Sequence, residues 1–259
     1  MYRELFYICL ALFGVVSGMY NNGIIANPGQ YPFTVSIQTR ALGEELHVCT
    51  GAIINEHWVV TAAQCLYNNP KTIVAGLIYI DDETDLNKQI VNIEKTITYP
   101  KFDSDGNAHY DIALIKVIEA FQFNDAVQPA KLPESGAQGS GNADIVGYSY
   151  SLYHNYHHLV YRPALPIIEI QRCNEIIKTF KDFIYHQLYA DKDSNICVLD
   201  HFGNNCNEDL GEPLYQNETL LGLASFWVMP CFEQGSPDIF TNIAYFVEWI
   251  NQVIEDNSI

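Results

Sequence analysis

Short apolar stretches recur along the chain after residue 23, and Gly, Pro, Asn and Asp separate them. The clearest are Phe33–Ile37, Gly51–Ile54, Trp58–Ala63, Ile112–Val117, Ala143–Gly147 and Leu220–Ser225. Several short strands at this spacing are typical of an all-β barrel or sandwich. In Ala244–Ile254 the apolar residues instead recur every three or four positions, which predicts an amphipathic closing helix. No repeat or low-complexity linker interrupts Ile24–Ile259, so we expect one domain over residues 24–259.

The first 18 residues have the pattern of a secretory signal peptide. Arg3 lies in a short n-region, Leu5–Val16 is apolar, and small residues precede position 19. The apolar run is too short to span a bilayer core of about 30 Å, which favours a signal peptide over a membrane anchor. We therefore predict a signal peptide over residues 1–18 and a short leader or residual propeptide over Met19–Gly23.

Cysteine usage agrees with secretion. Cys9 leaves with the predicted signal, and six cysteines remain: Cys49, Cys65, Cys173, Cys197, Cys206 and Cys231. An even number in a secreted chain suggests disulfides. Zinc is the competing interpretation, but the chain has no Cys-x-x-Cys pair. We expect no cofactor. Separately, Asn217-Glu218-Thr219 has the sequence of a glycosylation acceptor, so Asn217 is a candidate glycosylation site.

The charge balance limits the partners. The chain has 13 Lys and Arg against 31 Asp and Glu, a formal net charge of −18. Such a surface repels phosphate backbones and anionic lipid, so we expect neither nucleic acid nor membrane as a partner, and basic proteins are the natural complement. Within the acidic loop Asp81–Asp85, clustered carboxylates suit calcium, although we favour a solvated loop.

Three segments resemble, in order, the signature segments of chymotrypsin-like serine proteases. They are Trp58–Cys65 (WVVTAAQC), Asp111–Lys116 (DIALIK) and Cys206–Leu214 (CNEDLGEPL), and Ile24–Asn27 resembles the family's mature N-terminus. The resemblance covers essentially all of the chain after the signal. It implies two packed six-stranded antiparallel β-barrels with a C-terminal α-helix. It also implies the disulfides Cys49–Cys65, Cys173–Cys197 and Cys206–Cys231.

The same resemblance implies that the catalytic triad is lost. Acyl transfer by this machinery needs a hydroxyl nucleophile, an imidazole base and a carboxylate that orients the imidazole. The family's His is Gln64 here and its Ser is Leu210, whereas Asp111 is retained. An amide cannot act as a general base near neutral pH, and loss of the Ser or the His alone reduces turnover about a millionfold in a comparable enzyme. We therefore expect no protease activity.

Other family glycines are also replaced. Glu208 stands where the family has a Gly two residues before the nucleophile, and it would bring negative charge to a site that stabilises an oxyanion. Glu212 replaces the Gly two residues after the nucleophile. In the specificity pocket, Asn204 matches the base and Asp238 matches one wall. Trp227 matches the opposite wall. Its indole would close the pocket in either case, whether the ring fills the pocket or packs in the core.

Activation is the next difference from the family. Family zymogens are cut after Arg or Lys, and the new Ile ammonium pairs with the Asp that precedes the nucleophile. That residue is Asp209 here, yet Gly23 precedes Ile24. Because a buried carboxylate without a partner is unfavourable, we expect Asp209 to be hydrogen-bonded elsewhere or partly exposed, as in a zymogen.

Tyr148–Arg162 (YSYSLYHNYHHLVYR) gathers three His and five Tyr. By resemblance it is a variable surface loop, so the simplest expectation is an exposed polar-aromatic loop. A metal clamp through His154, His157 and His158 is one alternative. A protein-contact patch is another, because Tyr supplies contact area at low entropy cost. We predict no metal site.

Among inactive homologues, the chain most resembles the inactivated serine protease paralogues of the scabies mite, relatives of the mite group 3 allergens. Ile24–Phe33 (IIANPGQYPF), the lost triad and the acidic charge carry this likeness. It implies a protein secreted into the gut lumen that interferes with host complement or related defence proteases through a surface exosite. The alternatives are a regulatory or decoy pseudoprotease of an arthropod cascade, and an enzyme with rearranged catalytic residues.

Overall fold

A computed structural model describes residues 23–41, 43–102, 109–151, 156–179, 188–199, 209–227 and 235–257. The predicted signal peptide, residues 19–22, and the predictions for His154, Asn204, Cys206, Glu208 and Cys231 lie outside these ranges. The described elements are β1 (Ile24–Ile25), β2 (Thr34–Ala41), β3 (Glu44–Asn55), β4 (Trp58–Thr61), η1 (Ala63–Asn68), β5 (Thr72–Ala75), β6 (Gln89–Thr98), β7 (Ala113–Val117), β8 (Asn142–Ser151), β9 (Tyr156–Ile168), α2 (Ile170–Thr179), β10 (Asn195–Leu199), β11 (Pro213–Gln216), β12 (Thr219–Trp227), β13 (Pro237–Asn242) and α3 (Ile243–Asp256).

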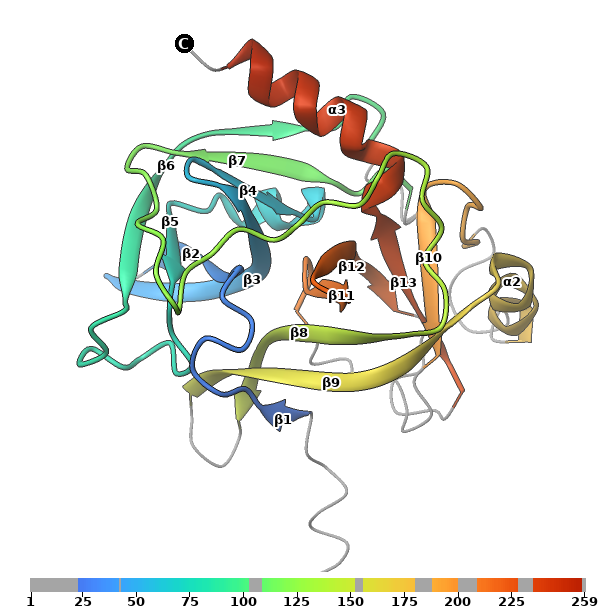
Figure 1. The fold of residues 1–259 in the computed structure, drawn as a ribbon, viewed down its shortest axis with the longest axis horizontal. Coiled ribbons are helices and arrows are strands. Elements are labelled where there is room, and N and C mark those ends of the chain that lie inside the picture. Colours follow the sequence, from blue (N-terminus) through green and yellow to red (C-terminus); the bar gives the residue numbers. More distant parts are fainter. Residues whose placement is uncertain are drawn as a thin grey trace, which may run out of the picture.

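The first half of the chain forms a closed antiparallel barrel with the strand order β2-β3-β4-β7-β6-β5 (Figure 1). Its interior is a cluster of buried apolar side chains that includes Ile37, Ile53, Ile115 and Phe121. On β6, more exposed and less exposed residues alternate, as expected for a strand with one face toward a core. Burial of these apolar side chains is the main force that closes the barrel.

The second half forms a sheet in the order β1-β9-β10-β13-β12-β11-β8, and pairing of β8 with β9 closes its six long strands into a second barrel. The short β1 lies outside this ring, paired to β9. Ile145, Val198, Leu214 and Phe240 fill the interior. The two barrels and the closing helix confirm the predicted fold class.

Helix α3 joins the two halves. Its apolar residues recur at the predicted helical spacing, and Phe246, Ile250 and Val253 share one core cluster with Trp58 and Leu114 of the first barrel. The helix begins where the Asn242 side chain accepts a hydrogen bond from the Ala244 amide. The predicted closing helix over Ala244–Ile254 is therefore confirmed, and it anchors the second barrel to the first.

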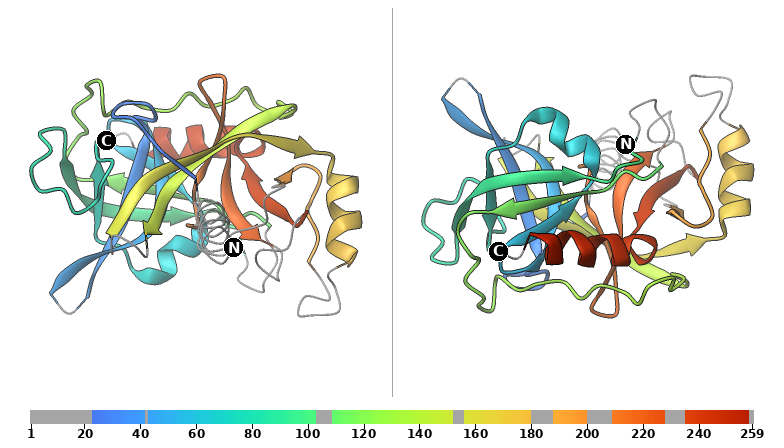
Figure 2. Two further views of the ribbon diagram at one scale, coloured as in Figure 1. Left: turned by 90° about the horizontal axis from the view of Figure 1, so that it is seen from below. Right: turned by 90° about the horizontal axis from the view of Figure 1, so that it is seen from above.

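Two of the three predicted disulfides are confirmed. Cys49 is bonded to Cys65 and Cys173 to Cys197, whereas the third pair lies outside the described residues. The second bond ties α2 to β10 on the far side of the molecule from the first barrel (Figure 2). Such bonds fit an extracellular protein. In the described part of the chain, no helix is long and apolar enough to cross a membrane.

The expectation of an exposed loop over Tyr148–Arg162 is wrong. This segment is a hairpin in which Tyr148 pairs with Leu159 and Gly147 with Val160, with residues 152–155 outside the description. Tyr148, Leu159 and Val160 are buried. The loop was expected from the family resemblance, and the alternation of inward and outward side chains did not correct it because it is spread over two strands with a gap between them.

Candidate functional site

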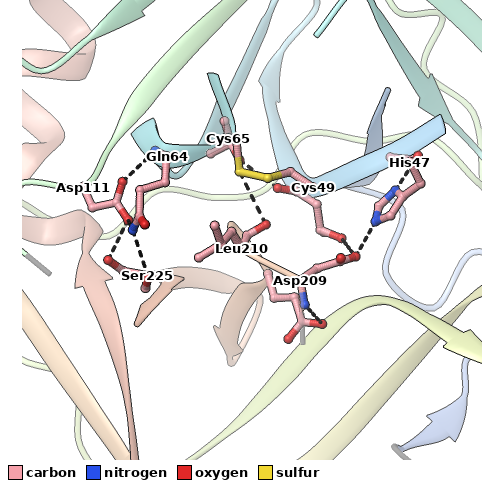
Figure 3. The surroundings of a disulfide bond; sticks show 12 residues. His47, Cys49, Gln64, Cys65, Asp111, Asp209, Leu210 and Ser225 are labelled. Carbon is pink, nitrogen blue, oxygen red and sulfur yellow. Dashed lines mark hydrogen bonds and ion pairs between the residues drawn. A yellow bond between two sulfur atoms is a disulfide. The ribbon is translucent and has the colours of Figure 1, made fainter. Parts of the chain in front are cut away.

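Strand register brings Gln64 to Asp111. Thr61 at the end of β4 pairs with Ala113 at the start of β7, so the residues just beyond these strand ends meet. The Gln64 backbone amide donates to Asp111 Oδ1 at 3.0 Å, and its side-chain amide donates to Asp111 Oδ2 at 2.7 Å. The same side-chain nitrogen also donates to the Ser225 carbonyl oxygen at 3.1 Å. Gln64 therefore bridges η1, Asp111 and β12 (Figure 3).

Asp111 is fully buried and is surrounded by neutral donors. The Ser225 hydroxyl donates to its Oδ2 at 2.7 Å, in addition to the Gln64 amides. Burial raises the pKa of Asp111, and the hydrogen bonds from Ser225 and Gln64 only partly offset this effect. None of these donors can take a proton from a nucleophile near neutral pH.

Leu210 lies between the Asp111 cluster and Asp209 in Figure 3. It packs against the core cluster that contains the Cys49–Cys65 disulfide, and its carbonyl accepts a hydrogen bond from the Thr50 amide at 3.1 Å. Gly211 follows with a φ of 80°, and a Cβ there would lie 2.2 Å from the Thr50 carbonyl oxygen. The loop is thus held tightly against β3, with an aliphatic side chain where the resemblance expects a hydroxyl.

Glu212 occupies a buried position against Gly147 of β8. Only 4% of the residue is exposed, and a Cβ on Gly147 would lie 2.2 Å from its Oε1 atom. Its Oε1 also accepts from the Asp209 amide at 3.4 Å. The carboxylate therefore fits into space that is open only because residue 147 is Gly.

Asp209 has partners other than an N-terminal ammonium. Its Oδ2 atom contacts His47 Nε2 and accepts a hydrogen bond from the Thr50 hydroxyl at 3.1 Å. Its side chain is 16% exposed. Meanwhile Ile24 lies on β1 opposite Tyr161 and is 52% exposed. The prediction that Asp209 is hydrogen-bonded elsewhere is confirmed.

His47 belongs to none of the motifs recognised in the sequence. Its Nδ1 atom lies 2.8 Å from Ser36 Oγ, so Ser36, His47 and Asp209 form a chain of hydrogen-bonding side chains. This chain resembles a nucleophilic triad in composition, but Ser36 is fully buried and the His47 side chain is only 2% exposed. A substrate cannot reach it. A His two residues before a disulfide-bonded Cys, on a strand with apolar neighbours on both sides of it, was the available signal.

His157 lies against this network. Its ring centroid is 4.7 Å from that of His47. Burial lowers the pKa of His157, and the neighbouring His47 lowers it further. His158 instead lies near Tyr79 on the other face of β9, with ring centroids 6.2 Å apart. Because the two imidazoles face different neighbours, they do not converge on one ion.

Two positions assigned to opposite walls of a pocket lie side by side. Trp227 of β12 pairs in register with Asp238 of β13, and Asp238 is 2% exposed. Asp238 also pairs with Val198 of β10. The residue predicted for the base of the pocket, Asn204, lies outside the described residues, so the assignment of the pocket stays a prediction.

The acidic loop Asp81–Asp85 uses its carboxylates locally. Asp82 accepts from the amide and hydroxyl of Thr84, and Glu83 pairs with Lys88 at 2.6 Å. No group of three or more His, Cys, Asp or Glu in the described ranges is placed to hold a metal ion. This arrangement fits the interpretation of a solvated loop.

Asn217 lies at the exposed turn between β11 and β12. Asn217 and Glu218 have φ values of 47° and 64°, as expected for a tight two-residue hairpin turn. The candidate glycosylation residue is thus on the surface, where an enzyme could reach it.

Comparisons with known proteins agree with this geometry. A family model described as Trypsin matches residues 20–250. Trypsin-1 of Astacus astacus is 29% identical over 234 residues, which cover 86% of this chain and 94% of the relative. Trypsin II-P29 of Gallus gallus is 31% identical over 228 residues, which cover 86% and 84%. Chymotrypsin-like elastase family member 1 of Homo sapiens is 28% identical over 246 residues, which cover 91% and 92%.

Proposed function

Because this chain belongs to the trypsin family, we propose that it is a secreted, catalytically inactive member that acts by binding other proteins. The observation that carries the proposal is the contact between Gln64 and Asp111. The amide donates to the carboxylate from the place where catalysis in this family requires an imidazole. Leu210 adds that the nucleophile position holds no hydroxyl.

Active proteolysis is the competing proposal, because relatives carry the names of trypsins and an elastase. The contacts of Asp111 argue against it. Ser225 offers a hydroxyl to Asp111 but is only 1% exposed, and its neighbour there is the Gln64 amide rather than a base. The buried Ser36–His47–Asp209 chain argues equally against rearranged chemistry, since its hydroxyl is out of reach.

The arrangement of Asp209 supports a locked, zymogen-like conformation. Its carboxylate is engaged by His47 and Thr50, while Ile24 is held on β9. Release of Asp209 would require breaking contacts with two side chains that are themselves packed in place. A protein of this kind acts through its surface rather than through a cleft that matures on cleavage.

We further propose host complement, or related defence proteases, as the target in a gut lumen. Its support is the likeness of the N-terminal segment IIANPGQYPF and of the lost triad to the scabies mite paralogues. The net charge of −18 favours encounter with basic proteins or basic faces. A regulatory or decoy role in the producing animal is the alternative.

The test is complement-mediated lysis in human serum, with and without the oxidised, folded chain. A heat-unfolded sample at equal concentration is the control. Dose-dependent protection by the folded chain alone is expected, and Gln64→Ala should protect equally because binding does not use the degenerate triad. Absence of protection would contradict the complement target, and protection that required substrate turnover would contradict the inactive mechanism.

A further inference from the structure

An aromatic surface lies beside the degenerate triad, outside every motif discussed above. We define the aromatic patch as His109, Tyr110, Tyr189 and Tyr245. It combines the residues just before Asp111, the segment before β10 and the first turn of α3. The last two segments lie side by side, because the Asn242 amide donates to the Ser194 carbonyl oxygen (Figure 1).

The rings of the patch contact one another; two of them are exposed, and His109 and Tyr110 are partly buried. His109 and Tyr189 have centroids 4.5 Å apart, and Tyr110 and Tyr245 are 6.3 Å apart. Tyr189 is 51% exposed and Tyr245 is 39% exposed. Such rings usually pack inward, so a group of them at one place on the surface is typical of a contact site.

Other aromatic side chains pack against the Tyr110 ring of the patch. Tyr99 stacks on Tyr110 with centroids 5.7 Å apart and meets Trp249 edge-on at 5.2 Å. Tyr110 itself has a φ of 56°, an uncommon backbone conformation for a non-Gly residue. Since the Tyr110 ring is already fixed by these contacts, a partner that docks on it has little conformational entropy to remove there.

The patch also has the charge pattern of a cation site. The ammonium of Lys101 lies 5.8 Å from the centroid of the Tyr110 ring, so this ring already accepts a positive charge from the chain itself. The carboxylate of Asp191 interacts electrostatically with His109 and Tyr245. Although burial opposes its ionisation, hydrogen bonds from Ser194 and Asp193 lower the pKa of Asp191 and keep it charged.

We propose that the aromatic patch binds an arginine-containing basic segment of a partner protein. The guanidinium stacks on one of the two exposed rings, Tyr189 or Tyr245, and is attracted by Asp191, and Lys101 competes for the face of Tyr110. This inference rests on the proposed function, because it names the surface and the partner chemistry of an inactive binding protein. The overall charge of −18 attracts the segment, and the rings give it a place to dock.

The first test measures fluorescence anisotropy with a labelled Gly-Arg-Gly-Arg-Gly peptide and a citrulline analogue that lacks the charge. The Arg peptide should bind more tightly, and the difference should shrink with salt. Tyr189→Ser with Tyr245→Ser should weaken binding by about fivefold or more, the loss expected for cation–π contacts. Tyr79→Ser removes an exposed Tyr elsewhere and should leave the affinity unchanged. If the unsubstituted chain, the double Tyr variant and Tyr79→Ser all bound the Arg peptide with equal affinity, the attraction would be non-specific, and the proposal would be overturned.

A second test predicts a change of opposite sign. Lys101→Ala frees the Tyr110 ring, so it should tighten binding of the Arg peptide more than Lys71→Ala does. Both changes remove one positive charge from an exposed position, but Lys71 lies before β5 and bonds to Asn69. Equal effects of the two substitutions would contradict a role for the ring.

The two proposals fail separately. If the Tyr variants bind the peptide normally while the chain still protects cells in serum, the aromatic patch is wrong and the binding function stands. If the chain hydrolyses substrates while the Tyr variants lose the peptide, the inactive mechanism is wrong and the patch stands.

Discussion

The side-chain nitrogen of Gln64 lies 2.7 Å from Asp111 Oδ2 and 3.1 Å from the Ser225 carbonyl oxygen. One amide thus satisfies two acceptors that belong to different barrels. The contact links the two barrels through a group that cannot act as a base near neutral pH. This is why we propose a structural rather than a catalytic role for the position.

Restoring two triad residues should not restore activity. Gln64→His with Leu210→Ser supplies the missing imidazole and hydroxyl, but Asp209 remains bonded to His47 and Glu212 remains packed on Gly147. We expect hydrolysis of fluorogenic peptides to stay at the level of the unsubstituted chain. Clear turnover by the double variant would show that the loop can reach an active geometry and that our account of the pocket is wrong.

His47→Gln should destabilise the fold. The substitution removes the imidazole that joins Ser36 to Asp209 in a buried setting, so we expect the free energy of unfolding to fall by about 1–3 kcal/mol. Urea denaturation at pH 7 measures this. His57→Gln alters an exposed imidazole at the β3–β4 turn and should change the value by less than about 0.5 kcal/mol. Similar values for both variants would contradict the proposed lock.

Gly147→Ala tests whether the Glu212 side chain occupies the space that Gly147 leaves open. Because the new Cβ would lie 2.2 Å from Glu212 Oε1 and 2.4 Å from its Cγ, we expect a loss of about 1–3 kcal/mol in unfolding free energy. Glu212→Ala removes the clashing atoms, so the double variant should lose less than the sum of the single variants. Additive losses in this cycle would mean that the two residues do not share the space.

His157 should make stability depend on pH. Its folded-state pKa is lowered by burial and then by His47, so the unfolded chain binds the proton more readily than the folded chain does. Stability is therefore retained above the ordinary His pKa of about 6.5 and falls as the pH drops through the folded-state pKa. His157→Gln should lose less stability than the unsubstituted chain between pH 7.5 and 5 in thermal melts, whereas His57→Gln should match the unsubstituted chain.

Local patterns in the sequence were enough to predict much of the fold. Trp58–Thr61 and Ala113–Val117 are short apolar strands, and the period of Ala244–Ile254 is helical, so each identifies its own element. The disulfides Cys49–Cys65 and Cys173–Cys197 followed from the family resemblance. The resemblance also assigned Gln64 and Asp111 to one triad, and the pairing of β4 with β7 brings the two residues together.

Other features needed the three-dimensional structure. Helix α2 buries only Cys173 and Ile177, so its apolar stripe is too narrow to stand out in the sequence. His47 and Asp209 are 162 residues apart, and neither belongs to a pattern that includes the other. The aromatic patch likewise comes from three separate segments of the chain. Each segment contributes only one or two aromatic residues, which give no signal in the sequence by themselves.

Substrate turnover by the folded chain, before and after removal of residues 19–23, tests the central claim most directly. A broad library of fluorogenic peptides would be used, with a trypsin as the positive control. We predict no hydrolysis above buffer in either form, because Gln64 and Leu210 supply neither base nor nucleophile. Hydrolysis by the trimmed chain that Asp111→Asn abolishes would contradict the account and make the protein an enzyme.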